Sequence, residues 1–407
     1  MPIPPLAIAN YTATTALGRG RAAQRDGLRA RRSGLRRNDF GPARADGSLL
    51  PTWIGRVDGL EDAPLPDELV AWECRNNRLA WLALQQDGLL AEAMALGRRH
   101  GRERVAVVVG TSTSSIGATE EAYTRLEPDA DGNPRFPADL RRPIVHTPHS
   151  LGHFVQAATG LRGPCVTVAT ACSSSAKVFA QAARLIAGGF ADAALVGGVD
   201  TLCGSVLYGF NSLGLVSSER CRPFDARRDG LSLGEAGGFA LLERAAPGAG
   251  GAQLLGYGES SDAHHMSAPH PEGLGARMAM ADALARAGID AAAVGHLNLH
   301  GTATPANDAA EARAVAALFP PGLHAASTKG WTGHTLGAAG IVESVFALLA
   351  LEHGELPGTL GGETPDPANG PQIRFDDGLL AQDAPRYAMN NSFGFGGNNC
   401  SLVFGYA

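Results

Sequence analysis

Three apolar runs rich in β-branched residues most restrict the folds open to this chain. Buried strands are predicted at residues 165–170 (CVTVAT) and 191–199 (ADAALVGGV), and the segment 104–115 (RVAVVVGTSTSS) predicts a buried strand that runs into a small-residue loop. The segment between the last two runs predicts a helix whose apolar face comprises Val178, Phe179, Ala182, Leu185 and Ile186. A strand–helix–strand unit of this length predicts a parallel crossover, so we expect an α/β fold.

A related pattern returns in the second half of the chain. Residues 325–330 (AASTKG) are strand-like, and the helix expected after them has a shared apolar face of Val342, Val345, Phe346 and Leu349. The Pro/Gly/Ala-rich segment 246–253 (APGAGGAQ) is the best candidate boundary between the two halves. We therefore expect an internal duplication, with halves at residues 1–247 and 252–407.

Composition excludes several classes of protein. The 407 residues are 44% hydrophobic and 18% charged, which is typical of a globular protein with a sizeable core. The net charge of −6 argues against nucleic acid as a partner, because phosphate binding needs clustered Lys and Arg. No apolar stretch approaches about 18 residues, and the N-terminus lacks signal-peptide features, so we expect a cytoplasmic protein without a membrane span.

Six cysteines occur, without a CxxC pair or a Cys/His set at zinc-ligand spacing, so free thiols are expected. Cys172 differs from the others because it lies where the strand at 165–170 meets the following helix. A helix start favours an anion and would lower the pKa of this thiol, as in a nucleophile. Cysteine is also among the most buried residue types, so a structural thiol is the alternative.

Three later segments place His, Lys or Phe among glycines and threonines: 297–311 (LNLHGTATPANDAAE), 327–340 (STKGWTGHTLGAAG) and 390–404 (NNSFGFGGNNCSLVF). The first puts His300 at the end of an apolar run. The second predicts a loop with Lys329 and His334 before a helix. The third predicts a glycine-dense loop with Phe393 and Phe395 before a final strand. None of these segments is specific alone.

Together with the cysteine turn, these segments resemble the signature of the β-ketoacyl-acyl-carrier-protein synthases, condensing enzymes of fatty acid and polyketide synthesis. The resemblance runs from residue 104 onward and includes GFNSLGLVS, CRPFDARRDGLSLGEAGGFALLE and GYGESSDAHHMSAPHPEG. It is closer to the elongating branch, because the initiating branch carries Asn where His334 stands. The first hundred residues match poorly. The resemblance implies a thiolase-like fold with two pseudo-symmetric halves in α-β-α-β-α layers, the cysteine in the first half and both histidines in the second.

The implied reaction has two stages. Cys172 takes an acyl group from a carrier thioester, and malonyl-carrier then loses carbon dioxide and attacks the acyl-enzyme to give a β-ketoacyl-carrier product. The resemblance implies that the N–H groups of Cys172 and Phe395 hold the acyl oxyanion. It also implies that His300 and His334 donate to the malonyl thioester oxygen.

Supporting roles follow from the same resemblance. Lys329 is expected to hold its loop by pairing with Glu343, with a direct electrostatic role in decarboxylation as the alternative. Phe393 and Phe395 are expected to gate access to the cysteine.

The segment after His300 carries two hydroxyls and two acids. Thr302 and Thr304 match positions that bind the pantetheine arm, with loop-capping hydroxyls as the alternative. Asp308 and Glu311 are assigned to helix-dipole interactions rather than to catalysis.

The acyl pocket is expected along residues 110–121 (GTSTSSIGATEE), around Thr113. The small polar side chains there suggest an unsaturated or aryl-primed chain. The acidic carrier protein would dock on a local basic patch, with candidates Arg75 and Arg78, or Arg220, Arg222, Arg227 and Arg228. We expect no cofactor or metal, because the pantetheine arm arrives on the carrier. A homodimer is expected, with a heterodimer containing a Cys-less partner as the alternative.

The sequence motifs argue against several competing functions. A degradative thiolase has a second catalytic cysteine in a C-x-G-G loop, whereas Cys400 follows the glycines inside an expected strand. A non-catalytic chain-length partner subunit would have lost the nucleophile, but Cys172, His300 and His334 are all present. The motifs of serine hydrolases and dinucleotide-binding enzymes are not matched.

Overall fold

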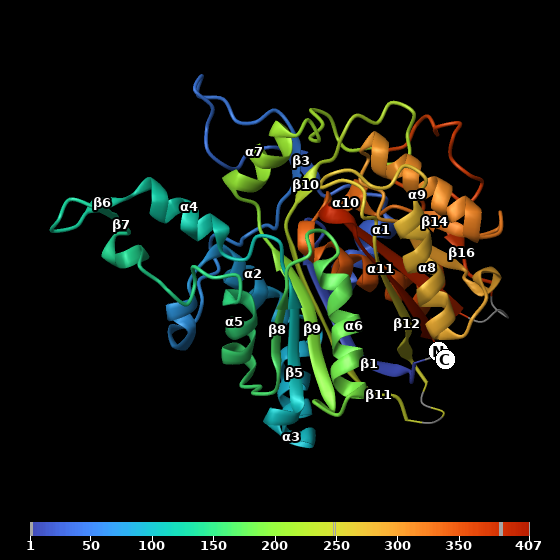
Figure 1. Cartoon of the computed structure of the whole chain (residues 1–407), viewed down its shortest axis with the longest axis horizontal. Coiled ribbons are helices and arrows are strands. Elements are labelled where there is room, and N and C mark those ends of the chain that lie inside the picture. Colours follow the sequence, from blue (N-terminus) through green and yellow to red (C-terminus); the bar gives the residue numbers. More distant parts are fainter. Residues whose placement is uncertain (1–2, 247, 249, 382–385, 407) are drawn as a thin grey trace.

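Two five-stranded runs with the same pattern form the central sheet of the computed structural model, which describes residues 3–246, 248, 250–381 and 386–406 (Figure 1). The first run is β8 (Cys165–Val168), β5 (Val105–Gly110), β9 (Ala193–Asp200), β11 (Ala236–Arg244) and β1 (Leu6–Thr15). The second run is β14 (His324–Ala326), β13 (His296–Asn298), β17 (Arg386–Gly394), β18 (Asn398–Tyr406) and β12 (Ala252–Ser261). In each run, two parallel pairings are followed by two antiparallel ones.

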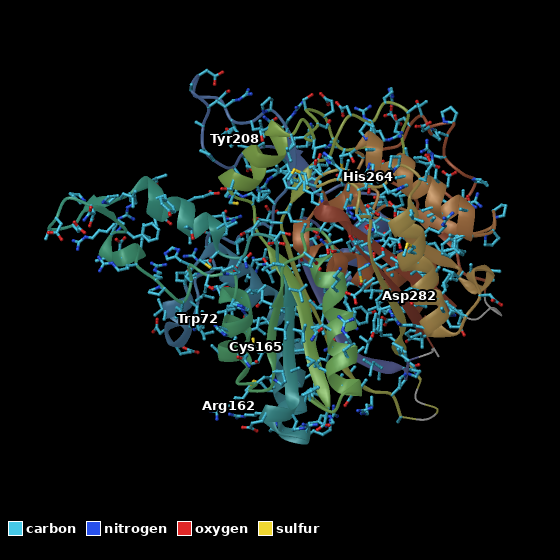
Figure 2. All side chains as sticks on the ribbon, in the orientation of Figure 1. Trp72, Arg162, Cys165, Tyr208, His264 and Asp282 are labelled. Atoms are coloured by element: carbon cyan, nitrogen blue, oxygen red, sulfur yellow. The ribbon has the colours of Figure 1, made fainter. Side chains whose placement is uncertain are left out.

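The two runs join where β1 pairs with β12, through Leu6 opposite Leu254 and Ala7 opposite Gln253. The expected boundary falls between the end of β11 and the start of β12, and residues 247 and 249 lie outside the described residues. The limits of the two halves stay a prediction, although the repeated strand pattern agrees with duplication. At the other end, β8 is an edge strand, and it carries Cys165 (Figure 2).

Helices occupy three layers around these strands. The middle layer contains α6 (Ser174–Ala187) and α11 (Ala339–His353), which contact each other and strands of both runs. One outer layer is built from α2 (Arg75–Leu84), α3 (Leu89–His100) and α5 (Ser150–Thr159). The other outer layer is built from α8 (Leu274–Ala287) and α9 (Pro305–Leu318). The layered α-β-α-β-α architecture expected from the resemblance is confirmed.

The middle position explains why α11 is more buried than its sequence predicts. A single apolar face was expected, but the helix is buried all round from Ala339 to Leu351, because both strand runs pack against it. The span Leu336–His353 has a mean hydropathy of 1.5 and 89% of it is buried, as in a core helix. Where α11 meets α6, a side chain at Gly340 would lie 2.3 Å from the backbone nitrogen of Ala176, so this crossing requires glycine.

The remaining helices surround this core: α1 (Gly20–Arg29), α4 (Ile116–Thr124), α7 (Gly204–Ser212) and α10 (Lys329–Thr332). With the short strands β6 (Glu127–Pro128) and β7 (Pro134–Arg135), α4 forms an arm that projects from the body (Figure 1). This arm contains the expected exposed insertion at residues 128–143. The other short strands are β2 (Gly18–Arg19), β3 (Leu35–Arg37), β4 (Trp53–Gly55), β10 (Leu233–Gly234), β15 (Glu355–Leu356) and β16 (Gly378–Leu379).

Two local expectations were wrong. Phe393 lies in β17, which pairs with β18 up to Gly394, so the glycine-dense loop is reduced to the 3-10 turn η7 (Phe395–Gly397). Lys329 starts the one-turn helix α10 rather than lying in a loop. Both segments are rich in glycine, which sequence patterns associate with loops even where the backbone is paired or helical.

Candidate active site

Cys172, His300 and His334 meet in the interior of the protein. Their Sγ and ring nitrogen atoms lie within 4.8 Å of one another, and the three residues are 5%, 2% and 1% exposed. His334 Nε2 lies 2.9 Å from Cys172 Sγ, and the two imidazole rings meet edge to face at 5.4 Å between centroids. The structure therefore brings the three candidate residues together, and their catalytic roles stay predictions.

A tight turn between β8 and α6 presents the cysteine. Ala171 has a left-handed backbone (φ 53°), which a non-glycine residue adopts only when its surroundings hold it there. Ser174 Oγ accepts the N–H of Thr170 at 2.9 Å and donates to the carbonyl of Ala171 at 2.6 Å. Ser173 Oγ donates to the carbonyl of Thr170 at 2.9 Å. The serines that follow Cys172 thus fix the position of its sulfur.

The acid–base state of this thiol differs from the sequence expectation. Burial raises the pKa of Cys172 to about 12, although the Lys329 ammonium and the N–H of Phe395 act to lower it. The expected lowering at a helix start was wrong, because desolvation of a thiolate outweighs these contacts at so buried a site. The thiol is therefore neutral before it reacts, and a base must take its proton. The ring nitrogen of His334 is in place to do so.

Lys329 fixes the tautomer and the charge state of His300. Its Nζ lies 3.4 Å from His300 Nδ1, donates to the carbonyl of His300 and pairs with Glu343 Oε1 at 2.5 Å. An ammonium can only donate, so His300 Nδ1 accepts and the ring proton is assigned to Nε2. Burial, with Lys329 and His334 nearby, holds the pKa of His300 well below its ordinary value, and the ring is neutral. Burial raises the pKa of Glu343 to about 7, against the effect of Lys329.

Two acids anchor the loop that carries His300. Glu311 accepts the backbone N–H groups of His300 and Gly301, each at 2.8 Å. Asp308 accepts the N–H of Ala303 at 3.2 Å. Both acids are buried, so the sequence assignment to helix-dipole interactions missed their main contacts. Their position at a helix start does not predict that their carboxylates accept hydrogen bonds from the backbone of the preceding loop.

A cavity of about 240 Å³ opens over the three residues. Its walls include the expected Thr302, Thr304, Phe393 and Phe395. Sequence reasoning missed other lining residues, namely Phe210, Leu215, Leu231, Asp262, Ser267, Ala268, Pro269, Asn307 and Asn399. Several lie in segments that carry the family resemblance, but most of their side chains are apolar, and no motif singled out the polar ones.

Aromatic rings line the approach to the sulfur. Phe395 stacks on Phe210 with ring centroids 5.5 Å apart, and its backbone N–H acts to lower the pKa of the Cys172 thiol. Phe393 lies 5.9 Å from the ring of His300. The two hydroxyls deeper in the wall, Thr302 and Thr304, lie 2.9 Å apart and bond each other.

Thr113 does not line this cavity within the described part of the chain. Its hydroxyl donates to Asp200 Oδ1 at 2.6 Å, and its N–H donates to the same oxygen at 2.7 Å. Thr113 instead borders a separate cavity of about 250 Å³, together with His146 and Ala169. Its role in acyl binding stays a prediction. The buried Asp200 that holds this loop was missed because it follows a predicted strand without a motif.

Most of the candidate docking arginines form ion pairs with carboxylates of the same chain. Arg75 pairs with the buried Glu235 at 2.6 Å, and Arg78 pairs with Glu73 at 2.5 Å. Arg228 pairs with Asp366 at 2.6 Å, and Arg227 with Glu363 at 2.7 Å. Arg220 instead lies over the ring of Trp53 at 4.2 Å. Neither Arg220 nor Arg222 has a carboxylate partner within the described residues; Arg220 is exposed and Arg222 is half-buried.

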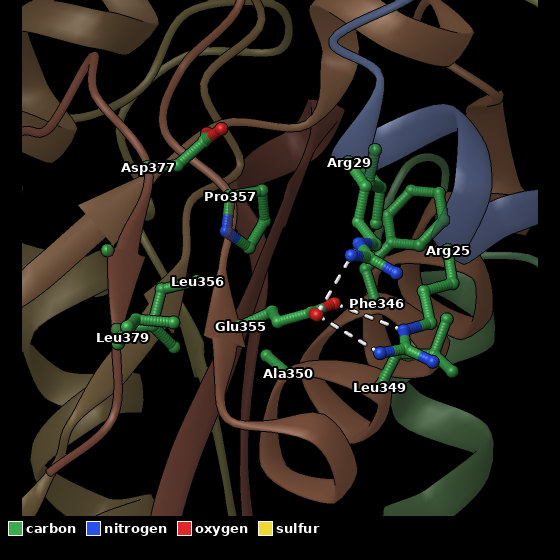
Figure 3. A pocket seen from close by; sticks show the side chains of 12 residues that line it. Arg25, Arg29, Phe346, Leu349, Ala350, Glu355, Leu356, Pro357, Asp377 and Leu379 are labelled. Atoms are coloured by element: carbon green, nitrogen blue, oxygen red, sulfur yellow. Dashed lines mark hydrogen bonds and ion pairs between the residues drawn. The ribbon is translucent and has the colours of Figure 1, made fainter.

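A further cavity, of about 210 Å³, lies between α1, α11 and the β15–β16 hairpin. Figure 3 shows the carboxylate of Glu355 between Arg25 and Arg29, at 3.0 and 3.5 Å. Among the described residues, this cavity shares no lining residue with the one over Cys172. Glu355 pairs with Arg25 and Arg29, and Asp377 pairs with Arg31, which indicates contacts that tie α1 and the residues after it to the β15–β16 strand pair rather than a reaction site.

Cys172, His300 and His334 also have the donor types of a zinc site. Metal binding through His300 Nε2 would move the ring proton to Nδ1, which faces the Lys329 ammonium. A dication would also be repelled by that ammonium. The surroundings of the three residues therefore favour proton transfer over metal coordination.

Comparisons with known proteins agree with this geometry. Residues 76–247 match the family model described as beta-ketoacyl synthase, N-terminal domain, and residues 251–363 match the C-terminal domain. The chain is 36% identical over 326 residues to the mitochondrial 3-oxoacyl-[acyl-carrier-protein] synthase of Arabidopsis thaliana, covering 74% of this chain and 68% of that protein. It is 34% identical over 317 residues to 3-oxoacyl-[acyl-carrier-protein] synthase 2 of Staphylococcus aureus, covering 74% of this chain and 77% of the relative.

Solved structures extend the similarity to nearly the whole chain. A ketosynthase in complex with its chain length factor from Xenorhabdus doucetiae is 36% identical, with a TM-score of 0.87, over 99% of this chain and 98% of that one. A beta-ketoacyl synthase from Burkholderia phymatum is 29% identical, with a TM-score of 0.86, over 100% of both chains. The thiolase-like fold is therefore confirmed, including the region before residue 76.

Proposed function

The chain belongs to the β-ketoacyl synthase family of decarboxylative condensing enzymes, and from this premise we propose how its own residues carry the reaction. The enzyme is an acyltransferase that joins an acyl thioester to malonyl-acyl carrier protein in fatty acid or polyketide synthesis. The convergence of Cys172, His300 and His334 in one buried chamber is the observation that supports the roles below.

In the first stage, Cys172 Sγ attacks the carbonyl carbon of the carrier-bound acyl thioester. Its proton passes to His334 Nε2, which lies 2.9 Å away. The carbonyl oxygen becomes an oxyanion that accepts from the N–H groups of Cys172 and Phe395. Collapse of this intermediate restores the carbonyl and breaks the carbon–sulfur bond to the carrier, whose thiolate leaves with the proton from His334 and leaves the acyl group on Cys172.

In the second stage, the thioester oxygen of malonyl-carrier accepts hydrogen bonds from Nε2 of His300 and of His334. The bond to the malonyl carboxylate breaks, carbon dioxide leaves, and the enolate is stabilised by these two donors. The enolate carbon attacks the acyl carbon on Cys172, which gives the β-ketoacyl-carrier product. The released thiolate takes up one proton from solution through His334.

Other residues bind the substrate and control its access to the Cys172 sulfur. Thr302 and Thr304 bind the pantetheine arm in the cavity wall, and Phe393 and Phe395 gate the approach to the sulfur. Thr113 borders the acyl chain from the neighbouring cavity, and the small side chains of the segment 110–121 are the ground for proposing an unsaturated or aryl-primed chain. No resident cofactor or metal takes part, since the arm arrives on the carrier. The cytoplasmic location expected from the sequence stays part of this proposal.

The partners are an acyl carrier protein and a second thiolase-like chain. Arg220 and Arg222 receive the acidic carrier, because they lack carboxylate partners within the described residues. The edge strand β8, whose residues are all half-buried, forms the dimer contact. We propose a homodimer. The alternative is a heterodimer with a Cys-less partner. It would be indicated if the chain stayed monomeric in solution until such a partner was co-expressed. The Xenorhabdus doucetiae ketosynthase was solved in complex with its chain length factor.

Intact-protein mass spectrometry tests the reaction directly. The protein is incubated with a panel of acyl carriers, and the added mass at Cys172 identifies the preferred acyl group. The matched control is Cys165→Ala, because all six cysteines are described and Cys165 alone is not fully buried. We expect Cys165→Ala to load like the wild type and Cys172→Ala to gain no mass. Loading that survives in Cys172→Ala, or a wild type that loads from no carrier, would overturn the proposal.

A further inference from the structure

A histidine-rich loop borders the cavity over Cys172 and has no part in the proposed condensation. The loop spans residues 262–273 (DAHHMSAPHPEG), and four of its members line the cavity: Asp262, Ser267, Ala268 and Pro269. His264 and His270 face each other with ring centroids 5.2 Å apart. His264 is exposed and lies in the upper half of the view in Figure 2, as does Tyr208 of α7.

The loop is tied to the glycine turn beside the sulfur. Gly396 donates its N–H to the carbonyl of Met266 at 2.7 Å, and Asp262 donates its N–H to the carbonyl of Gly397 at 3.0 Å. The side-chain amide of Asn399 donates to Asp262 Oδ1 at 2.9 Å. These bonds hold the loop across the rim of the cavity. His264 and His270 do not line the cavity themselves, but they belong to the same loop as the four residues that do, and His270 directly follows Pro269.

The hydrogen bonds of His270 determine what it can offer. Its Nδ1 accepts the backbone N–H of Glu272 at 3.2 Å, so the proton of the neutral ring is assigned to Nε2. The nearby acids have partners: Asp262 accepts the N–H of His270 at 3.2 Å, and Glu272 lies 3.5 Å from Arg313. An N–H donor at Nε2 suits an anion. A transition metal would need the Nε2 lone pair and would force a proton onto Nδ1, against the Glu272 N–H.

We propose that His264 and His270 bind the phosphate of the phosphopantetheine arm at the mouth of the cavity. This rests on the proposed function, since it names the part of that substrate which the loop recognises. The thioester end of the arm must reach Cys172, so its phosphate, at the carrier end, stays toward the rim. Imidazole N–H groups form charge-assisted hydrogen bonds with phosphate oxygens. Acidic side chains of the carrier protein are the other source of anionic contacts, and the experiment separates the two.

Loading of Cys172 is measured in a single turnover from three donors with the same acyl group: acyl-pantetheine, acyl-4′-phosphopantetheine and acyl-carrier protein. A chelator is present throughout. The test variant is His264→Ala/His270→Ala. The matched control is His149→Ala/His153→Ala, a second exposed pair, with ring centroids 6.0 Å apart, which does not line the Cys172 cavity within the described residues.

We expect the wild type to prefer acyl-phosphopantetheine over acyl-pantetheine and the test variant to lose about 2- to 10-fold in kcat/KM with both phosphorylated donors. Its loading from acyl-pantetheine should stay at the wild-type rate, and the control should match the wild type with every donor. Equal loss with all three donors, loss with the carrier alone, or no loss would each overturn the inference. A wild type that loads from none of the donors would instead overturn the proposed function.

Discussion

Lys329 Nζ lies 3.4 Å from His300 Nδ1, and the same ammonium pairs with the buried Glu343. The contact makes the two active-site imidazoles unequal. His300 has its proton fixed on Nε2, whereas His334 Nδ1 has no partner within the described residues. No hydrogen bond to Nδ1 within the described residues fixes the tautomer of His334, so its Nε2 is not restricted to donating and can accept the thiol proton in the first stage. His300 is held as a donor only.

Lys329→Ala should impair decarboxylation more than acyl loading. Without the ammonium, His300 no longer has its proton fixed on Nε2, so one donor to the enolate oxygen is weakened. Loss of such a donor costs about 10²- to 10³-fold in rate. Release of carbon dioxide from malonyl-carrier is measured by a coupled carbonate assay, and loading is measured by intact mass.

The control for this substitution is Lys177→Ala. Lys177 and Lys329 are the only lysines in the sequence. Lys177 lies on α6 and contacts Asn398 and Glu259 rather than either imidazole. The Lys177→Ala variant should therefore release carbon dioxide at the wild-type rate. Equal loss of loading and decarboxylation in Lys329→Ala would contradict the tautomer argument and indicate a collapsed site.

Substitution of each active-site histidine should impair a different stage of the reaction. His334→Ala removes the base beside the Cys172 sulfur, and loading should fall about 10²-fold or more. His300→Ala leaves that contact intact, so loading should persist while carbon dioxide release falls about 10²- to 10³-fold. Rapid-quench measurement of acyl-enzyme, followed by product assay, resolves the stages. Normal loading in His334→Ala would show that another group takes the thiol proton.

The sequence predicts the framework of this site better than its chemistry. Hydrophobic periodicity places Cys172 at the junction of β8 and α6, because both elements have strong local patterns. The long-range convergence with His300 and His334 came from family resemblance, since no local pattern encodes contacts between distant loops. The raised pKa of Cys172 could not be predicted, because it depends on burial by those loops. The hydrogen bonds from the N–H groups of His300 and Gly301 to Glu311 could not be predicted either, because they too depend on how the loop folds.

Acyl loading should remain active through the pH at which an ordinary histidine becomes protonated. Burial and the Lys329 ammonium hold the pKa of both His300 and His334 well below 6.5. A base with a lowered pKa stays neutral as the pH falls through its ordinary value, so His334 can still accept the thiol proton there. Single-turnover loading between pH 7.5 and 5.8 should show no half-loss centred near 6.5. A titration at that pH, with the carrier still folded, would contradict the burial argument.

Gly340→Ala should separate α6 from α11 and disturb the site between them. The added methyl would lie 2.3 Å from the backbone nitrogen of Ala176, in the helix that follows Cys172, and α11 follows the loop of His334. Overpacking of this kind costs about 1–3 kcal/mol. We expect a lower Tm by calorimetry and slower loading in the folded fraction. Gly209→Ala is the matched control, because it lies in α7 with no neighbouring atom within 4 Å of the new methyl, and it should keep or raise the Tm. An unchanged Tm in Gly340→Ala would mean that the two helices do not cross as closely as the structure has them.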